Sequence, residues 1–174
     1  GELKEKGIVD FIIATGCLSQ RYGHELMEEM PELNAVIGIS DYHSITDVVE
    51  RVSNNEKIIL VNPPPSEFME KGSRILTTPP GSAYLKITEG CNNRCAYCAI
   101  PSIRGNLRSQ TLEDLVNEAN LLSSQGVKEL VLVGQDTASY GKDLGVHNLP
   151  QLLTELAKVP DLEWIRLMYV HPAQ

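Results

Sequence analysis

The chain has 174 residues, 42% of them hydrophobic, which is enough apolar content for the core of one domain and part of another. Its formal net charge of -8 argues against a large phosphate-binding surface, because such a surface needs clustered lysine and arginine side chains. No apolar run approaches the ~20 residues of a membrane-spanning helix, and no apolar leader precedes a cleavage site. We therefore expect a cytoplasmic protein without membrane attachment.

The first part of the chain alternates short apolar runs with helical segments. Residues 10–14 form a continuous apolar run typical of a strand covered on both faces in a parallel sheet, and a second short strand is predicted at 35–37. Helix-forming residues dominate 19–30, which Pro31 ends, and apolar residues recur at helical spacing over 45–54. This alternation predicts an α/β fold.

Proline clusters separate this part from the rest of the chain. Residues 55–80 include the stretches NPPPSEF and TTPPGS, in which proline removes backbone donors and interrupts regular structure. We expect an extended interdomain linker here, with a domain boundary near residue 80.

Beyond the linker the alternation of strands and helices resumes. The predicted elements are strands at 83–87, 129–133 and 164–168, and helices at 112–125 and 149–157. Thr111 is expected to cap the first of these helices and Gly126 to end it. Strands that alternate with helices pair in parallel, and three such strands form an open piece of a barrel.

Three of the four cysteines lie in one short stretch, GCNNRCAYCAIPSIRG, as Cys91, Cys95 and Cys98. A structural zinc site needs four ligands, and no second ligand pair follows Cys98. Disulfides are disfavoured by the odd number of clustered cysteines and by the reducing cytosol. An iron–sulfur cluster takes thiolates from a loop that wraps around it, and three thiolates leave one iron open for chemistry. The spacing therefore favours an iron–sulfur cluster with an open coordination position.

This loop, in CxxxCxΦC form with Tyr97 as the aromatic residue, resembles the signature of radical S-adenosylmethionine (SAM) enzymes. The resemblance implies a 4Fe-4S cluster whose open iron is chelated by the amino and carboxylate groups of SAM, and which splits that cofactor to a 5'-deoxyadenosyl radical. It also implies that Tyr97 lies against the cluster or the adenine. Gln135 and Asp136 follow the end of a predicted strand, where a polar contact to SAM is expected.

Several further stretches together resemble the radical SAM methylthiotransferase family: ATGCLSQRYG, VGQDTASYGKDLG and WIRLMYVHP. The stretch GQDTASYGKDLG resembles the branch that modifies the β-carbon of an aspartate in a small-subunit ribosomal protein, the RimO type. The fold implied by this resemblance is α/β. A partial N-terminal methylthiotransferase domain with the proline-rich linker would span 1–78, and the first strands and helices of a radical SAM partial TIM-like barrel would span 79–174.

The family's N-terminal domain holds a second, auxiliary 4Fe-4S cluster on three cysteines, and Cys17 matches the third of them. The other two would lie before Gly1, so the resemblance implies a fragment that is inactive in the full reaction. The implied partners of the complete enzyme are the ribosomal protein as substrate and an electron donor such as a flavodoxin-like protein. No residue is assigned as a catalytic acid or base.

Two alternatives stay open at this point. A tRNA adenosine methylthiotransferase (MiaB-like), with tRNA as its partner, would share every cysteine, and only the stretch GQDTASYGKDLG and the acidic charge disfavour it. A non-enzymatic iron–sulfur electron carrier would normally fill all four ligand positions, and the missing fourth cysteine disfavours it.

Overall fold

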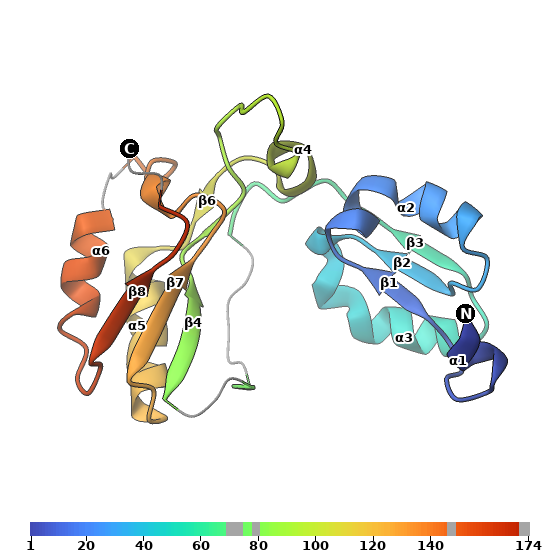
Figure 1. Ribbon diagram of the computed structural model, residues 1–174, viewed down its shortest axis with the longest axis horizontal. Helices are drawn as coiled ribbons and strands as arrows, with labels where there is room; N and C mark the ends of the chain where they lie inside the picture. Colours follow the sequence, from blue (N-terminus) through green and yellow to red (C-terminus); the bar gives the residue numbers. More distant parts are fainter. Residues whose placement is uncertain (69–74, 78–80, 146–148, 171–174) are drawn as a thin grey trace. The chain divides into compact units, whose positions relative to one another are not determined.

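The computed structural model describes residues 1–68, 75–77, 81–145 and 149–170, and these form two compact units (Figure 1). The first unit comprises Gly1–Pro65 with Ser102–Gly105, and the second comprises Ser66–Pro101 with Asn106–Gln174. Residues 78–80, where the predicted boundary at 78 falls, lie outside the described residues, so that boundary stays a prediction.

The first unit is built on a parallel sheet with strand order β1-β2-β3. Its elements are α1 (Glu2–Glu5), β1 (Ile13–Thr15), α2 (Cys17–Glu29), β2 (Ala35–Ile37), the 3-10 helix η1 (Ile39–Ser44), α3 (Ile45–Ser53) and β3 (Ile58–Leu60). The predicted α/β alternation of this part is confirmed, although β1 lies further along the chain than the run 10–14, and α2 begins before residue 19.

Strand β2 is the centre of this unit, and its three residues are fully buried. Ala35 belongs to one apolar cluster with Val48 and Val52 of α3. Val36 points the other way, and a Cβ placed on Gly23 of α2 would lie 3.6 Å from its Cγ1. Because neighbouring side chains of a strand point to opposite faces, α2 and α3 cover the two faces of the sheet (Figure 1).

Strand β3 corrects the predicted extent of the linker. The prediction of irregular structure over 55–80 was wrong for residues 58–60, which pair in parallel with β2 in the register Ala35↔Ile58. The apolar triplet Ile-Ile-Leu precedes the prolines at 63–65, and it completes the sheet before those prolines remove backbone donors.

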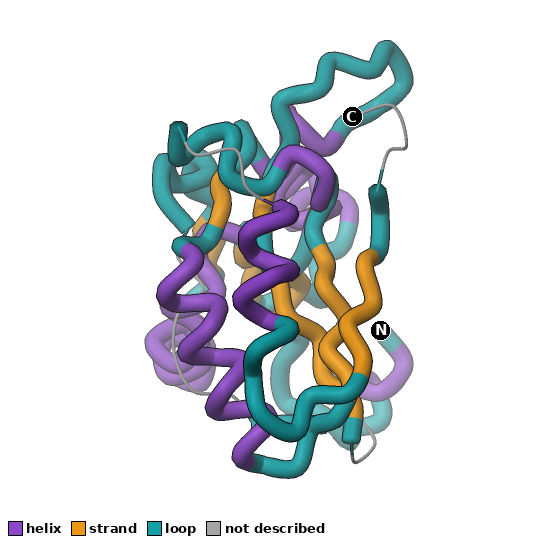
Figure 2. The backbone as a smooth tube through the Cα atoms, turned by 90° about the vertical axis from the view of Figure 1, so that its left-hand side faces the viewer, coloured by secondary structure: helices purple, strands orange, loops and turns teal. Residues whose placement is uncertain are grey.

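The second unit holds a second parallel sheet, as predicted, and its strand order is β4-β7-β8. Its elements are β4 (Ser82–Lys86), β5 (Thr88–Glu89), α4 (Ile100–Arg104, whose last residues cluster with the first unit), β6 (Arg108–Ser109), α5 (Leu112–Ser124), β7 (Glu129–Val133), the 3-10 helix η2 (Thr137–Ser139), α6 (Leu149–Leu156) and β8 (Trp164–Leu167). Helices α5 and α6 run alongside the strands (Figure 2).

One face of this sheet carries the core. Ala83 and Leu85 of β4 lie opposite Leu130 and Leu132 of β7, and all four are fully buried in one cluster with residues of α5 and α6. Both helices therefore cover the same face, as in a barrel whose strands follow one another in sequence order. On the other face Tyr84 is 55% exposed.

A short antiparallel stem interrupts the parallel pattern after β4. Thr88 pairs with Ser109 and Glu89 with Arg108, so β5 and β6 bring the two ends of segment 90–107 together. This segment, which we call the cysteine loop, carries Cys91, Cys95 and Cys98. None of the helices in the described part of the chain is long and apolar enough to cross a membrane.

Candidate functional site

A pocket of about 240 Å³ lies in the second unit where the parallel strands end. It is lined by Cys91, Asn93, Cys95, Cys98 and Ile100 of the cysteine loop, by Gln135 and Asp136 after β7, and by Tyr169 and Val170 after β8. The carboxyl ends of parallel strands are the usual place for ligands in α/β sheets. Its volume is below the ~300 Å³ at which pockets for drug-sized ligands begin.

The pocket brings the three clustered cysteines together. All are free thiols: Cys91 is 9% exposed, Cys98 is half-buried, and Cys95 is exposed. Cys98 N donates to Cys95 O at 3.0 Å, which closes a turn between these two residues. In the described residues no three His, Cys, Asp or Glu side chains gather closely enough to hold a single metal ion. The three thiols line one pocket but do not converge on a single point. Thiolate sulfur is the donor that iron–sulfur clusters use, so these residues fit such a cluster.

Gln135 lies between the pocket and the start of the cysteine loop. Its Oε1 accepts a hydrogen bond from Gly90 N at 2.8 Å. Gly90 has a φ of 75°, a left-handed conformation that glycine adopts without strain. The structure thus gives Gln135 a contact to the loop that carries the cysteines, and its predicted contact to SAM stays a prediction.

Asp136 lines the pocket with only 5% of its surface exposed, and it bonds to the cysteine loop. Its Oδ2 accepts hydrogen bonds from Asn93 Nδ2 at 2.8 Å and from Ser139 Oγ at 2.7 Å. Asn93 N in turn donates to Cys91 Sγ at 3.4 Å. A carboxylate is therefore connected through Asn93 to the first cysteine of the loop.

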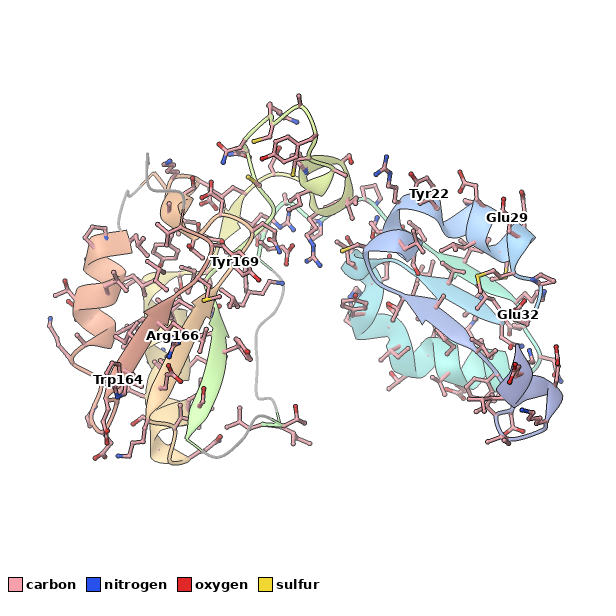
Figure 3. All side chains as sticks on the ribbon, viewed as in Figure 1. Tyr22, Glu29, Glu32, Trp164, Arg166 and Tyr169 are labelled. Atoms are coloured by element: carbon pink, nitrogen blue, oxygen red, sulfur yellow. The ribbon has the colours of Figure 1, made fainter. Side chains whose placement is uncertain are left out.

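Four pocket-lining residues were missed at the level of the sequence, namely Asn93, Ile100, Tyr169 and Val170. Asn93 is one of three residues between Cys91 and Cys95, and its spacing carries no signal of its own. Tyr169, labelled in Figure 3, follows β8 and has a φ of 58°, which is uncommon for a residue with a side chain. Its position just beyond the third parallel strand is the signal that could have identified it.

Tyr97 stands outside the set of described residues that line the pocket, and its side chain is 93% exposed. The structure therefore does not bring it together with Gln135. Its assignment as a cofactor-binding residue stays a prediction.

Cys17 belongs to the first unit. It is the first residue of α2, separated from the end of β1 by one residue, and its thiol is exposed. Arg104, whose segment 102–105 clusters with this unit, donates from Nη2 to Cys17 Sγ at 3.1 Å. The assignment of Cys17 to an auxiliary cluster stays a prediction.

The loop after β7, residues 134–145, folds back onto β6. Asp143 accepts hydrogen bonds from Ser109 N at 2.7 Å and from Ser109 Oγ at 2.6 Å, and Gly141 N donates to Ser109 Oγ at 2.9 Å. Burial, and secondarily the charge of Asp143, raises the pKa of Tyr140 to about 12. This loop thus has a defined conformation beside the cysteine loop.

Comparisons with known proteins agree with this site. Residues 85–169 match the Radical SAM superfamily. The chain is 60% identical over 172 residues to the ribosomal protein uS12 methylthiotransferase RimO of Syntrophomonas wolfei subsp. wolfei, covering 98% of this chain and 39% of the relative. Proteins of the same name from Thermoanaerobacter sp. (strain X514) and Clostridioides difficile (strain 630) are 48% and 46% identical, covering 99% and 98% of this chain and 39% of each relative.

A solved structure supports the fold alone. The radical S-adenosylmethionine methyltransferase TsrM from Kitasatospora setae superposes with a TM-score of 0.55 at 14% identity, covering 86% of this chain and 33% of that one. The chain spans 39% of the length of the relatives named above. Its residues 85–169 match the model of the Radical SAM superfamily, and over nearly its whole length the chain is similar to the proteins named ribosomal protein uS12 methylthiotransferase RimO.

Proposed function

We propose that the full-length protein carrying this chain is a radical SAM methylthiotransferase, which adds a methylthio group to the β-carbon of an aspartate in a small-subunit ribosomal protein. The observation that carries the proposal is the pocket at the carboxyl ends of β4, β7 and β8, which is lined by the thiols of Cys91, Cys95 and Cys98. The names of the relatives support the choice of substrate.

In this proposal the three thiolates hold a 4Fe-4S cluster, which together with SAM supplies the radical that activates an unreactive carbon. Gln135 and Asp136 hold the loop on which the thiolates sit, through Gly90 and Asn93. Tyr97 would contact the cofactor once the rest of the enclosure is present.

The proposal extends to the other parts of the reaction. Cys17 would be one ligand of an auxiliary 4Fe-4S cluster that delivers sulfur. The substrate would be recognised in part by the loop 134–145, which lies beside the cysteine loop and is anchored to Ser109. A flavodoxin-like protein or its equivalent would donate electrons, and the reaction would take place in the cytoplasm.

The test uses the full-length protein, reconstituted with iron and sulfide without oxygen and supplied with SAM and a reductant. We expect the ribosomal protein to gain one methylthio group on an aspartate, detected by mass spectrometry of its peptides, and tRNA to remain unmodified. Methylthiolated adenosine in tRNA would instead assign the protein to the tRNA branch. Iron uptake without any cleavage of SAM would leave only an electron carrier.

A further inference from the structure

Two side chains that follow β7 bond to the cysteine loop on either side of Cys91. Gln135 Oε1 accepts from Gly90 N at 2.8 Å, and Asp136 Oδ2 accepts from Asn93 Nδ2 at 2.8 Å. Cys91 itself is 9% exposed, whereas Cys95 is exposed. The loop is therefore anchored by hydrogen bonds on both sides of Cys91, whereas Cys95 is exposed to solvent.

Asp136 is the better anchored of the two side chains. Only 5% of its surface is exposed, and its Oδ2 also accepts from Ser139 Oγ at 2.7 Å. Hydrogen bonds to a carboxylate are roughly twice as strong as those between neutral groups. A buried carboxylate that loses a donor is costly, so this arrangement resists movement of Asn93.

Asn93 transmits this anchoring to the thiol. Its backbone N–H donates to Cys91 Sγ at 3.4 Å, while its side chain donates to Asp136. Groups that hydrogen-bond a metal ligand orient it and tune its affinity for the metal. The path from the carboxylate to the sulfur thus runs through a single residue.

We propose that Asp136 is a positioning residue that fixes Asn93 and thereby holds the Cys91 thiol in place before the cluster is assembled. This inference rests on the proposed function, since it takes Cys91 as a cluster ligand. Asp136 acts here through Asn93, so it would orient the Cys91 thiol for a cluster that Cys95 and Cys98 would also hold.

The experiment compares the full-length wild type with Asn93→Ala, Asp136→Ala and the double variant. Hydrogen exchange of the iron-free proteins reports on the amides of Gly90 and Asn93. Since each single variant loses the charge-assisted bond between Asn93 and Asp136, we expect each to exchange at least about tenfold faster at the amide of residue 93 and to assemble the cluster at least about tenfold more slowly under limiting iron and sulfide. The double variant should be no worse than Asp136→Ala, because both changes break the bond between Asn93 and Asp136 and only the loss of Asp136 also removes the bond from Ser139.

Asp143→Ala is the matched control, because Asp143 belongs to the same loop and likewise accepts two hydrogen bonds, both from Ser109. We expect its exchange at residues 90–93 and its assembly rate to equal those of the wild type. Should Asp136→Ala not fold, Asn93→Ala tests the same bond from a half-buried loop position.

Wild-type behaviour of Asn93→Ala, or additive effects in the double variant, would overturn the inference while the wild type still assembles its cluster. A slowing as large in Asp143→Ala would also overturn it, since the effect would then be a general loss of structure. A wild-type protein that assembles no cluster would remove the proposed function itself, and the inference with it. The two failures are therefore seen in different samples.

Discussion

Gly134 shows how closely single residues are fitted where β7 leads into the pocket. A Cβ at this position would overlap Thr88 Oγ1 and lie 3.1 Å from Thr88 O. Thr88 is fully buried, and its Oγ1 has no hydrogen-bond partner among the described residues. The strand can thus end next to the stem only because residue 134 has no side chain.

We predict that Gly134→Ala lowers the free energy of unfolding by about 1–3 kcal/mol, the cost of overpacking a core. Thr88→Ala in the same chain should recover part of this loss, because it removes the hydroxyl that the new methyl group meets. Urea unfolding of the two single variants and the double variant measures the coupling. Strictly additive losses would show that the steric explanation is wrong.

Tyr140 is a second single residue with a testable effect: it makes the free energy of unfolding depend on pH. Its pKa is raised from 10.0 to about 12, first by burial and then by the charge of Asp143. A raised pKa means that the folded protein holds the proton more tightly than the unfolded chain does. The resulting stability is complete below pH 10 and is lost as the pH rises through 12.

We therefore predict that the free energy of unfolding of the wild type falls by about 1 kcal/mol more than that of Tyr140→Phe between pH 8 and pH 11. Urea unfolding at both pH values measures the difference. The comparison between the two proteins cancels the titration of the other lysine and tyrosine side chains. Parallel losses in the two proteins would contradict the prediction.

At the scale of elements, the sequence predicts strands from apolar runs and helices from helical spacing, unless a stronger neighbouring signal outweighs them. Strands β2 and β7 were predicted with their observed bounds, because each is a continuous apolar run that is largely buried. Strand β3 was absorbed into the linker, since the prolines at 63–65 outweighed three apolar residues. Strands β5 and β6 have two residues each, and their pairing depends on the tertiary fold.

The N-terminal cap of α5 is a prediction from sequence that the structure confirms. Thr111 has extended backbone angles, and its Oγ1 accepts from Asp114 N at 3.2 Å. Thr111→Ala should cost about 1 kcal/mol of stability, whereas Thr111→Ser keeps the hydroxyl and should cost much less. Denaturant unfolding of both variants checks the prediction, and equal losses would mean that the cap contributes nothing.

At the scale of the whole molecule, part of the site follows from spacing and part does not. The CxxxCxxC spacing predicts one loop with three thiols, and all three line one pocket. Tyr169 and Val170 join them only because the parallel sheet brings three loops to one edge. A single sequence does not show which loops lie next to one another in the fold. Contacts between loops are therefore not predicted, whereas local patterns such as the cysteine spacing are.

The two predicted clusters can be separated in the full-length protein by two substitutions. We expect Cys95→Ala and Cys17→Ala each to retain about half of the wild-type iron, because each removes a ligand of a different cluster. After reduction, only the Cys17→Ala protein should show an electron paramagnetic resonance signal that changes on addition of SAM. An unchanged iron content in Cys17→Ala would remove Cys17 from the set of ligands.

The stem formed by β5 and β6 has a consequence for a cell that runs short of iron. The stem pairs the two ends of the cysteine loop through residues that are not cysteines. The buried core of the second unit consists of residues outside that loop. Small zinc-dependent domains, by contrast, unfold when their metal is withheld. We expect the iron-free protein to keep the near-ultraviolet circular dichroism of a packed core. Starved cells would then conserve folded chains that accept a cluster when iron returns, instead of degrading them and synthesising replacements.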